Sequence, residues 1–448
     1  MFYYYEKDQK ILASERNDLP YAQGKPIPGA PIYYLVEGDP VLGRGSFKVN
    51  HPGQLKAPHG LEVLDASRLP EFPLDATLSA ALEAGQLTAV NTGRVGWESV
   101  LSAAPSAGKK RLNILAIGDV GSTLLTGLKL LGGDVLSSIG ICDVSDQVTA
   151  RWEFEMGQIN LPWDYNAFPD VEVVPVEKLF DCDVFVFVAS RGIPPVGSKV
   201  KDVRMAQFET NAAIVKQYAK MARAANFQGL WCAVSDPVDP LAKTAYLESN
   251  KDENGQWDGQ GLRPEQVQGF GLGVMNARAA YYAKRDPRLA SFLTEGRSFG
   301  PHGTGLFIAN SIEHYDEAIS QELTHLTVTA NLWMRELGFK PYVAPALSSG
   351  ALSILLTLRG GMALRLGVPG RNLHGGEKPL YPRRGGDGAA SPYPGSALRP
   401  YPGGGGAFES HFVTRRSGRR RAGAHCAPLQ SVQRMKRRRS GVCTSPAT

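Results

Sequence analysis

The chain lacks any uninterrupted apolar stretch of about 18 residues, the length that a membrane-spanning helix needs. Its first ten residues, MFYYYEKDQK, carry charges where a secretory signal needs an apolar run. We therefore expect a cytoplasmic protein with no membrane partner. Among the 448 residues 43% are hydrophobic, enough for two or three domains with a sizeable core.

Cysteine and histidine are scarce, with five and eight residues respectively. No pair of cysteines has the spacing of a zinc knuckle, and the sequence predicts no metal site. Cys142, Cys182 and Cys232 lie in or beside stretches that are typical of buried strands. We expect these three to be reduced structural thiols.

Acidic residues are scarce in one region only. Residues 360–448 hold 16 Lys and Arg but three Asp and Glu, a net charge of +13, whereas the whole chain carries +6. The preceding residues therefore carry −7. The segment is rich in Gly, Pro and Arg without apolar periodicity, which is typical of disorder. One interpretation is a basic tail that binds nucleic acid or another polyanion.

A second interpretation is that the reading frame shifts after Arg359. When the bases are read one position later, Met362 followed by Ala contains the codon for Trp. With suitable third bases the shifted text ends in an amphipathic helical pattern, and a stop codon is available at Val413. We favour this interpretation, under which the tail has no evolved function and nucleic acid is no partner. The missing closing helix would leave an apolar face exposed.

The patterns of strand and helix divide the rest of the chain into three segments. Residues 1–110 contain aromatic strand-like pieces, FYYYEK and PIYYLVEG, and a helical stretch near Leu78–Gly85. They form an N-terminal extension of unknown role. From Arg111 strands and helices alternate, which predicts an α/β fold with a Rossmann-type parallel sheet domain over 111–240. An α+β substrate domain rich in helix signals follows over 241–359, and the disordered tail over 360–448.

The expected elements of the last two domains follow from these patterns. Strands are predicted at 112–118, 137–144, 171–176, 183–189 and 229–234, and helices at 123–131, 208–225, 276–284, 316–337 and 349–358.

Short segments that carry chemistry occur in one fixed order. They are AIGDVG at Ala116–Gly121, ICD ending at Asp143, FETNA at Phe208–Ala212, SDPVD at Ser235–Asp239, NAR ending at Arg278 and GPHG around His302. Their order and approximate spacing resemble the lactate and malate dehydrogenase family. The resemblance implies an NAD-dependent oxidoreductase that acts on a small 2-hydroxy acid, as a homo-oligomer.

The first segment, Ala116–Gly121, follows a predicted strand and opens a helix, as a dinucleotide fingerprint requires. Gly118 would let the backbone approach the pyrophosphate, and Gly121 would let helix and strand pack closely. Ala116 replaces the first glycine of the usual pattern, and Asp119 puts a carboxylate near the phosphates.

Further cofactor residues follow along the sheet. Asp143 ends the second strand and fits the acid that binds the adenosine ribose, which favours NAD over NADP; alone it would be taken for a helix cap. The resemblance also places Val120, Ala189 and Asn211 at the cofactor. Asn211 would contact the nicotinamide-side ribose from the start of a helix, or simply cap that helix.

Three cationic or titratable residues match the family's catalytic pattern. His302 resembles the histidine that takes and returns the hydroxyl proton. Arg278 resembles the arginine that grips the substrate carboxylate with its planar fork. Arg204 resembles the mobile-loop arginine that polarises the carbonyl, although the long loop would also allow Lys199 or Lys201.

Two positions depart from the family's pattern. Met275 stands where the family pairs its histidine with an aspartate, so a protonated His302 loses a stabilising partner. Asp236 stands where the family has an asparagine that donates to the substrate oxygen, and an ionised carboxylate cannot donate. We weigh two hypotheses. Either Asp236 has become the acid partner of His302, or the chain is a non-catalytic nucleotide-binding or structural member of the family.

Overall fold

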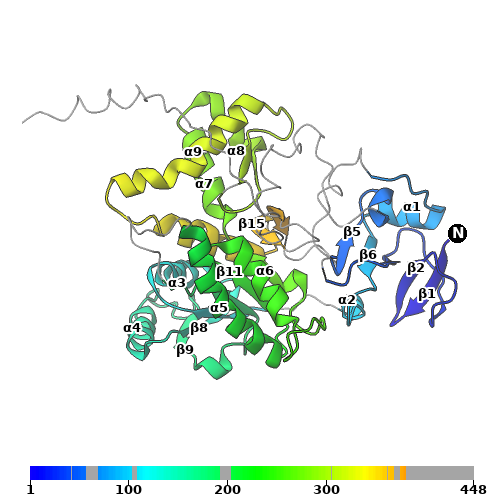
Figure 1. Ribbon diagram of the computed structural model, residues 1–448, viewed down its shortest axis with the longest axis horizontal. Helices are drawn as coiled ribbons and strands as arrows, with labels where there is room; N and C mark the ends of the chain where they lie inside the picture. Colours follow the sequence, from blue (N-terminus) through cyan, green and yellow to red (C-terminus); the bar gives the residue numbers. More distant parts are fainter. Residues whose placement is uncertain are drawn as a thin grey trace, which may run out of the picture. The chain divides into compact units, whose positions relative to one another are not determined.

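The computed structural model describes residues 1–41, 43–56, 69–102, 108–191, 203–303 and 305–360. At 203–206, and at 362–367 and 374–379, it describes the backbone alone. Figure 1 colours the chain from blue at the N-terminus to yellow and orange at the last described elements. The loop 192–202 and the residues from 380 onward lie outside the described residues.

The first hundred residues form a six-stranded mixed sheet in the order β3-β1-β2-β4-β6-β5. Asp8 and Gln9 adopt positive φ and close the β1–β2 hairpin, as the twist of such a turn requires. The strand pieces and the helix expected in this extension are therefore present. The elements are β1 (Tyr3–Lys7), β2 (Lys10–Ser14), β3 (Ala22–Gln23), β4 (Ile32–Val36), β5 (Ser46–Lys48), a 3-10 turn (Pro52–Leu55), α1 (Ala76–Glu83), β6 (Leu87–Asn91) and α2 (Ser99–Ser102).

The second sheet carries six parallel strands in the order β9-β8-β7-β10-β11-β12. In chain order this is 3-2-1-4-5-6, the doubly wound Rossmann arrangement, so the predicted fold class is confirmed. The strands are β7 (Lys110–Leu115), β8 (Leu136–Cys142), β9 (Asp170–Val173), β10 (Val184–Phe187), β11 (Leu230–Ala233) and β12 (Val267–Gly269). The sequence missed β12, which lies beyond the expected domain boundary at residue 240.

Successive side chains of these strands alternate between two cores, as the period of a strand requires. Val184 and Val186 belong to one hydrophobic cluster and Phe185 and Phe187 to the other. Helices α3 (Asp119–Leu131) and α4 (Asp146–Gly157) pack with the first cluster, and α5 (Val203–Ala224) and α6 (Val238–Ser249) with the second. Cys142, Cys182 and Cys232 form no disulfide among the described residues, and burial raises the pKa of Cys182 to about 12.

The remaining elements form a third cluster around α7 and α9. They are α7 (Leu272–Ala283), α8 (Phe292–Glu295), a hairpin of β13 (Arg297–Phe299) and β14 (Phe307–Ala309), and α9 (Glu317–Glu336). A π-helix (Pro345–Leu352) and α10 (Ser353–Leu358) follow. Ala351 and Leu355 join the first sheet cluster, so this end of the expected substrate domain packs on the nucleotide half.

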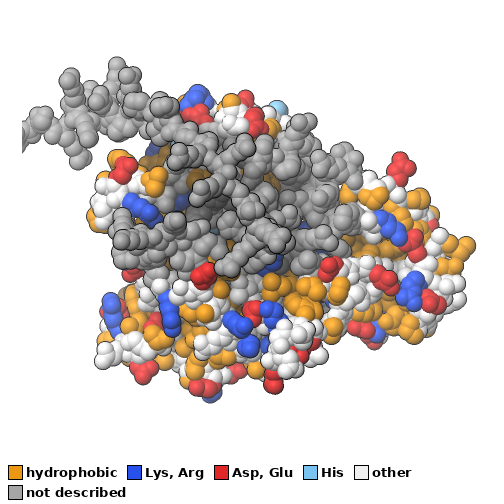
Figure 2. Space-filling view, viewed as in Figure 1, with side chains coloured by type: hydrophobic (Ala, Val, Ile, Leu, Met, Phe, Trp, Pro, Cys, Tyr) orange, Lys and Arg blue, Asp and Glu red, His pale blue; other side chains and the backbone are white. Residues whose placement is uncertain are grey.

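The C-terminal half of α9 is apolar and exposed. No residue of α9 after Thr327 is buried, and the exposed large hydrophobic side chains there and just beyond are Val328, Leu332, Trp333, Met334, Leu337 and Phe339. Figure 2 shows hydrophobic side chains on this part of the surface. None of the described helices is long and apolar enough to cross a membrane.

Two strands lie beyond the boundary expected at Arg359. The antiparallel pair β15 (Met362–Gly367) and β16 (His374–Pro379) extends the sheet, with Leu366 opposite Gly269 of β12. Regular structure therefore runs further than the composition of the tail predicts.

Candidate active site

The loop after β7 is shaped by close backbone approaches. A Cβ added to Gly121 would lie 2.1 Å from the carbonyl oxygen of Ala116, so only glycine fits there. Ala116 itself has a φ of +77°, the left-handed region that glycine adopts most readily. The backbone at residue 116 therefore keeps a conformation that favours glycine, although alanine occupies the position.

The start of α3 is open toward an incoming anion. Gly118 is the N-cap residue and supplies no side-chain hydrogen bond to the helix, and a Cβ added there would meet nothing within 4 Å. Free N–H groups and the helix dipole favour an anion at such an end. The exposed carboxylate of Asp119 opposes it, while Lys340 Nζ lies 3.8 Å from Asp119 Oδ2 and offsets part of this charge.

Asp143 holds the same loop from the neighbouring strand. Its Oδ2 accepts a 2.7 Å hydrogen bond from the Ile117 N–H, and its Oδ1 accepts one of 3.1 Å from the Ser145 N–H. Each carboxylate oxygen keeps acceptor capacity for a ribose hydroxyl. Val120, by contrast, packs its side chain against the first sheet cluster.

Asn211 ties together the loops after β10 and β11. Its Nδ2 donates to Ser190 Oγ at 3.2 Å and to the Asp236 carbonyl at 2.8 Å, and its Oδ1 accepts from the Arg191 N–H at 3.0 Å. The side chain is fully buried. Because α5 begins at Val203, Asn211 lies inside the helix and is no cap, which corrects the expected helix start. Ala189, in the first of these loops, accepts from Ser235 Oγ at 2.8 Å.

His302 lies in the loop that joins β13 and β14. Gly300 and Gly303 on either side have φ of +90° and +134°, conformations that bulkier residues rarely adopt. Nδ1 of His302 lies 2.9 Å from the carbonyl oxygen of Gly271, at the end of β12 and the start of α7. Since a carbonyl only accepts, Nδ1 carries the hydrogen, and Nε2 of the neutral ring keeps its lone pair.

Nε2 of His302 faces Asp236. The distance to Asp236 Oδ1 is 3.8 Å, within ion-pair range but beyond a hydrogen bond. The histidine side chain is 17% exposed and that of Asp236 55%. The acid partner suggested from the sequence would sit on the other ring nitrogen, where the structure has the neutral carbonyl of Gly271. Asp236 therefore lies beside Nε2, whereas Nδ1 faces an uncharged backbone group.

A buried carboxylate that sequence reasoning missed holds the histidine loop. Asp239 Oδ2 accepts a 3.0 Å hydrogen bond from the His302 N–H, 63 positions away. Burial, opposed by the charge and N–H of His302, raises the pKa of Asp239 to about 6. Its signal was the second aspartate of SDPVD, in the first turn of α6.

Arg278 projects from α7 and is partly buried. Among the described residues its guanidinium makes one weak hydrogen bond, from Nη1 to the sulfur of Met275 at 3.6 Å. Burial lowers its pKa, and the nearby Tyr282 and Asp236 oppose this effect. A guanidinium in such a setting is suited to a carboxylate ligand. Arg204 is the second residue of α5, and its side chain lies outside the described residues.

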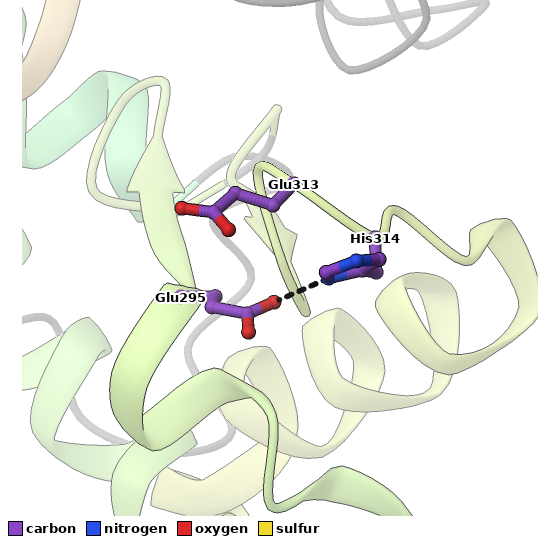
Figure 3. Close-up of side chains that lie close together, drawn as sticks. All are labelled: Glu295, Glu313 and His314. Carbon is purple, nitrogen blue, oxygen red and sulfur yellow. Dashed lines mark hydrogen bonds and ion pairs between the residues drawn. The ribbon is translucent and has the colours of Figure 1, made fainter.

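A second cluster of polar side chains lies on α8 and the loop before α9. Possible ligand atoms of Glu295, Glu313 and His314 lie within 4.8 Å of one another (Figure 3). Glu295 Oε2 pairs with Nδ1 of the exposed His314 at 3.2 Å and also accepts from Ser311. Because an ion pair accounts for this contact, we assign no metal to it.

No protein-family model matches the chain, and no curated protein matches it either. Solved structures do. A lactate dehydrogenase from a Medee basin deep-sea metagenome library matches with 17% identity and a TM-score of 0.48, covering 61% of this chain and 88% of that one. The minor L-lactate dehydrogenase of Enterococcus mundtii matches with 18% identity and a TM-score of 0.45, over 58% and 81%. The malate dehydrogenase of Picrophilus torridus matches with 15% identity and a TM-score of 0.46, covering 61% of this chain and 86% of that one.

Proposed function

We propose that this chain is an NAD-dependent oxidoreductase that interconverts a 2-hydroxy acid and a 2-oxo acid of the lactate or malate type. One observation carries the proposal. Residues 271 and 239 hold the loop of His302 at the carboxyl edge of the parallel sheet, with Nδ1 against the Gly271 carbonyl and Nε2 on the side of Asp236. Ligands of doubly wound folds bind along this edge, outside the carboxyl ends of the strands.

The residues after β7, β8 and β10 fit a dinucleotide. The open N-terminus of α3 at Gly118 suits the pyrophosphate, and the carboxylate of Asp143 suits the adenosine ribose. Val120 contributes through the backbone of the first helical turn, since its side chain packs inward. Ala189 would contact the cofactor from the loop after β10. NAD, when bound, accepts or supplies the hydride.

Asn211 has a narrower role than its resemblance implies. Both hydrogens of its amide are donated within the protein, so only Oδ1 has capacity left for a ribose hydroxyl. We propose that Asn211 chiefly positions the loops after β10 and β11.

His302 would move the proton. In hydroxy-acid oxidation Nε2 accepts the hydroxyl proton. The Gly271 carbonyl then keeps the protonated ring in position by its hydrogen bond with Nδ1, and the negative charge of Asp239 stabilises the positive charge of the ring. In the reverse direction the same nitrogen returns the proton to the oxo group.

Arg278 would bind the substrate carboxylate with two parallel hydrogen bonds. The thioether of Met275 competes weakly for the guanidinium, so the anion gains nearly the full interaction. We propose that Arg204 assists from the start of α5 by polarising the oxo group.

A non-catalytic nucleotide-binding role is the second candidate. The observation that favours it is the carboxylate of Asp236, 3.8 Å from Nε2 of the proposed base. A negative charge there opposes an anionic substrate unless that substrate brings a donor.

The test is NADH oxidation with pyruvate and with oxaloacetate. It is run on this chain and on a version whose reading frame is restored after Arg359. Turnover only in the restored chain supports the proposal and assigns the tail to a frameshift. NADH binding without turnover in either version favours the non-catalytic role.

A further inference from the structure

Asp236 places a carboxylate with open acceptors beside His302. Among the described residues, nothing donates a hydrogen bond to its carboxylate, and the side chain is half exposed. Its main-chain carbonyl is anchored by Asn211, so the position of the residue does not depend on the side chain. The backbone of Asp236 is therefore held in place, while its exposed carboxylate accepts no hydrogen bond from the described residues and is available to a ligand.

Three groups surround the place where a substrate would bind, and they differ in character. Arg278 offers donors to an anion, Nε2 of His302 offers a lone pair to one hydroxyl, and Asp236 offers acceptors to a second donor. A lactate-like acid uses the first two and leaves the carboxylate unpaired. Such an acid would cover the carboxylate and remove its water without replacing it, and a charge that loses water without gaining a partner costs binding free energy.

We infer that the preferred substrate carries a hydroxyl on the carbon next to the reacting one: a 2,3-dihydroxy acid, or in reverse a 3-hydroxy-2-oxo acid. This rests on the proposed function and names its substrate class. The 2-hydroxyl donates a hydrogen bond to Nε2 of His302, and the 3-hydroxyl donates one to the carboxylate of Asp236. Oxygens on adjacent carbons are spaced like hydrogen-bonded atoms, so they can bridge two groups 3.8 Å apart.

The test compares glycerate with lactate, which differ by this one hydroxyl, in both enantiomers. Dissociation constants are measured by NADH fluorescence on the full chain with saturating NADH, so that a hydroxy acid can bind but cannot react. The variants are Asp236→Asn and, as a matched loss of one exposed carboxylate elsewhere, Asp181→Asn. Asp236→Asn is nearly isosteric and leaves the carbonyl that Asn211 uses.

The expected result is about 10-fold tighter binding of glycerate than of lactate in the wild type and in Asp181→Asn, because a hydrogen bond to a charged group is a strong one. In Asp236→Asn the ratio falls below about threefold. Equal binding of the two acids, or an unchanged ratio in Asp236→Asn, overturns the inference while leaving the proposed function standing. Failure of both acids to bind in the presence of NADH overturns the proposed function as well.

Discussion

The loop at Ala116–Gly121 and the site around His302 lie at the same edge of one sheet but are built in opposite ways. The loop is six consecutive residues whose backbone makes the surface that we propose for the pyrophosphate. The histidine site takes Asp236 and Asp239 from one further segment and Gly271 from another, and its polar groups are mainly those of side chains. The comparison teaches that the first depends on shape, whereas the second depends on charge and on hydrogen bonds.

The largest expected effect falls on the histidine site. His302→Gln removes the proposed base and should lower kcat by about 10²- to 10⁴-fold in the frame-restored chain, with the NADH dissociation constant unchanged. His314→Gln, an exposed histidine outside the site, serves as the control in steady-state kinetics. Equal activity of both variants would deny His302 its role.

The loop Ala116–Gly121 should be sensitive to added side-chain volume. Gly121→Ala places a Cβ against the Ala116 carbonyl and should lower the free energy of unfolding by roughly 2–4 kcal/mol in urea titrations. Gly118→Ala has room and should change stability by less than about 0.5 kcal/mol while weakening NADH binding. If a stable Gly118→Ala variant bound NADH as tightly as the wild type, this would contradict the proposal that the loop binds the pyrophosphate.

The buried carboxylate of Asp239 predicts a pH dependence for the histidine site. Its pKa is raised to about 6 in the folded protein, so protonation favours the folded state and stability is lost as the pH rises through 6. Relative to Asp239→Asn, the wild type should gain roughly 1–2 kcal/mol in the free energy of unfolding between pH 7 and pH 4. The free energy of unfolding of both proteins is measured by urea titration at each pH. A difference between the two proteins that stays constant from pH 7 to pH 4 would contradict this prediction.

The smallest expected effect is a change in stability at Ala116. Ala116→Gly should raise the free energy of unfolding by about 0.5–1 kcal/mol, because it relieves a positive φ at the cost of unfolded-chain entropy. Ala150→Gly, on the exposed face of α4, should instead lose about 1 kcal/mol. Thermal unfolding of the pair shows whether the loop stores strain.

The fold was largely predictable because its strands are apolar runs and its helices periodic. All five predicted strands of the nucleotide half are present, whereas β12 was missed because three residues carry too little pattern. The site was predictable only where one residue carries its own signal, as for His302. The hydrogen bonds that Gly271 and Asp239 accept from His302 could not be predicted, since they join residues 31 and 63 positions apart through tertiary contacts.

The Asp236 carboxylate shows the same limit. The sequence indicates that an acid replaces the family's asparagine, and it suggested a relay with His302. Which ring nitrogen the carboxylate faces depends on how the β13–β14 loop is folded over the sheet, and only the structure shows it.

The most direct test of the central claim follows the hydride itself. NADH deuterated at both C4 positions is incubated with the frame-restored chain and a 2-oxo acid, and the product is analysed by mass spectrometry and NMR. We predict one deuterium at C2 of the hydroxy acid, and at equal times at least about 10²-fold less of this deuterated product from His302→Gln. NADH that binds to the wild type but delivers no deuterium to pyruvate, oxaloacetate or hydroxypyruvate would contradict the account.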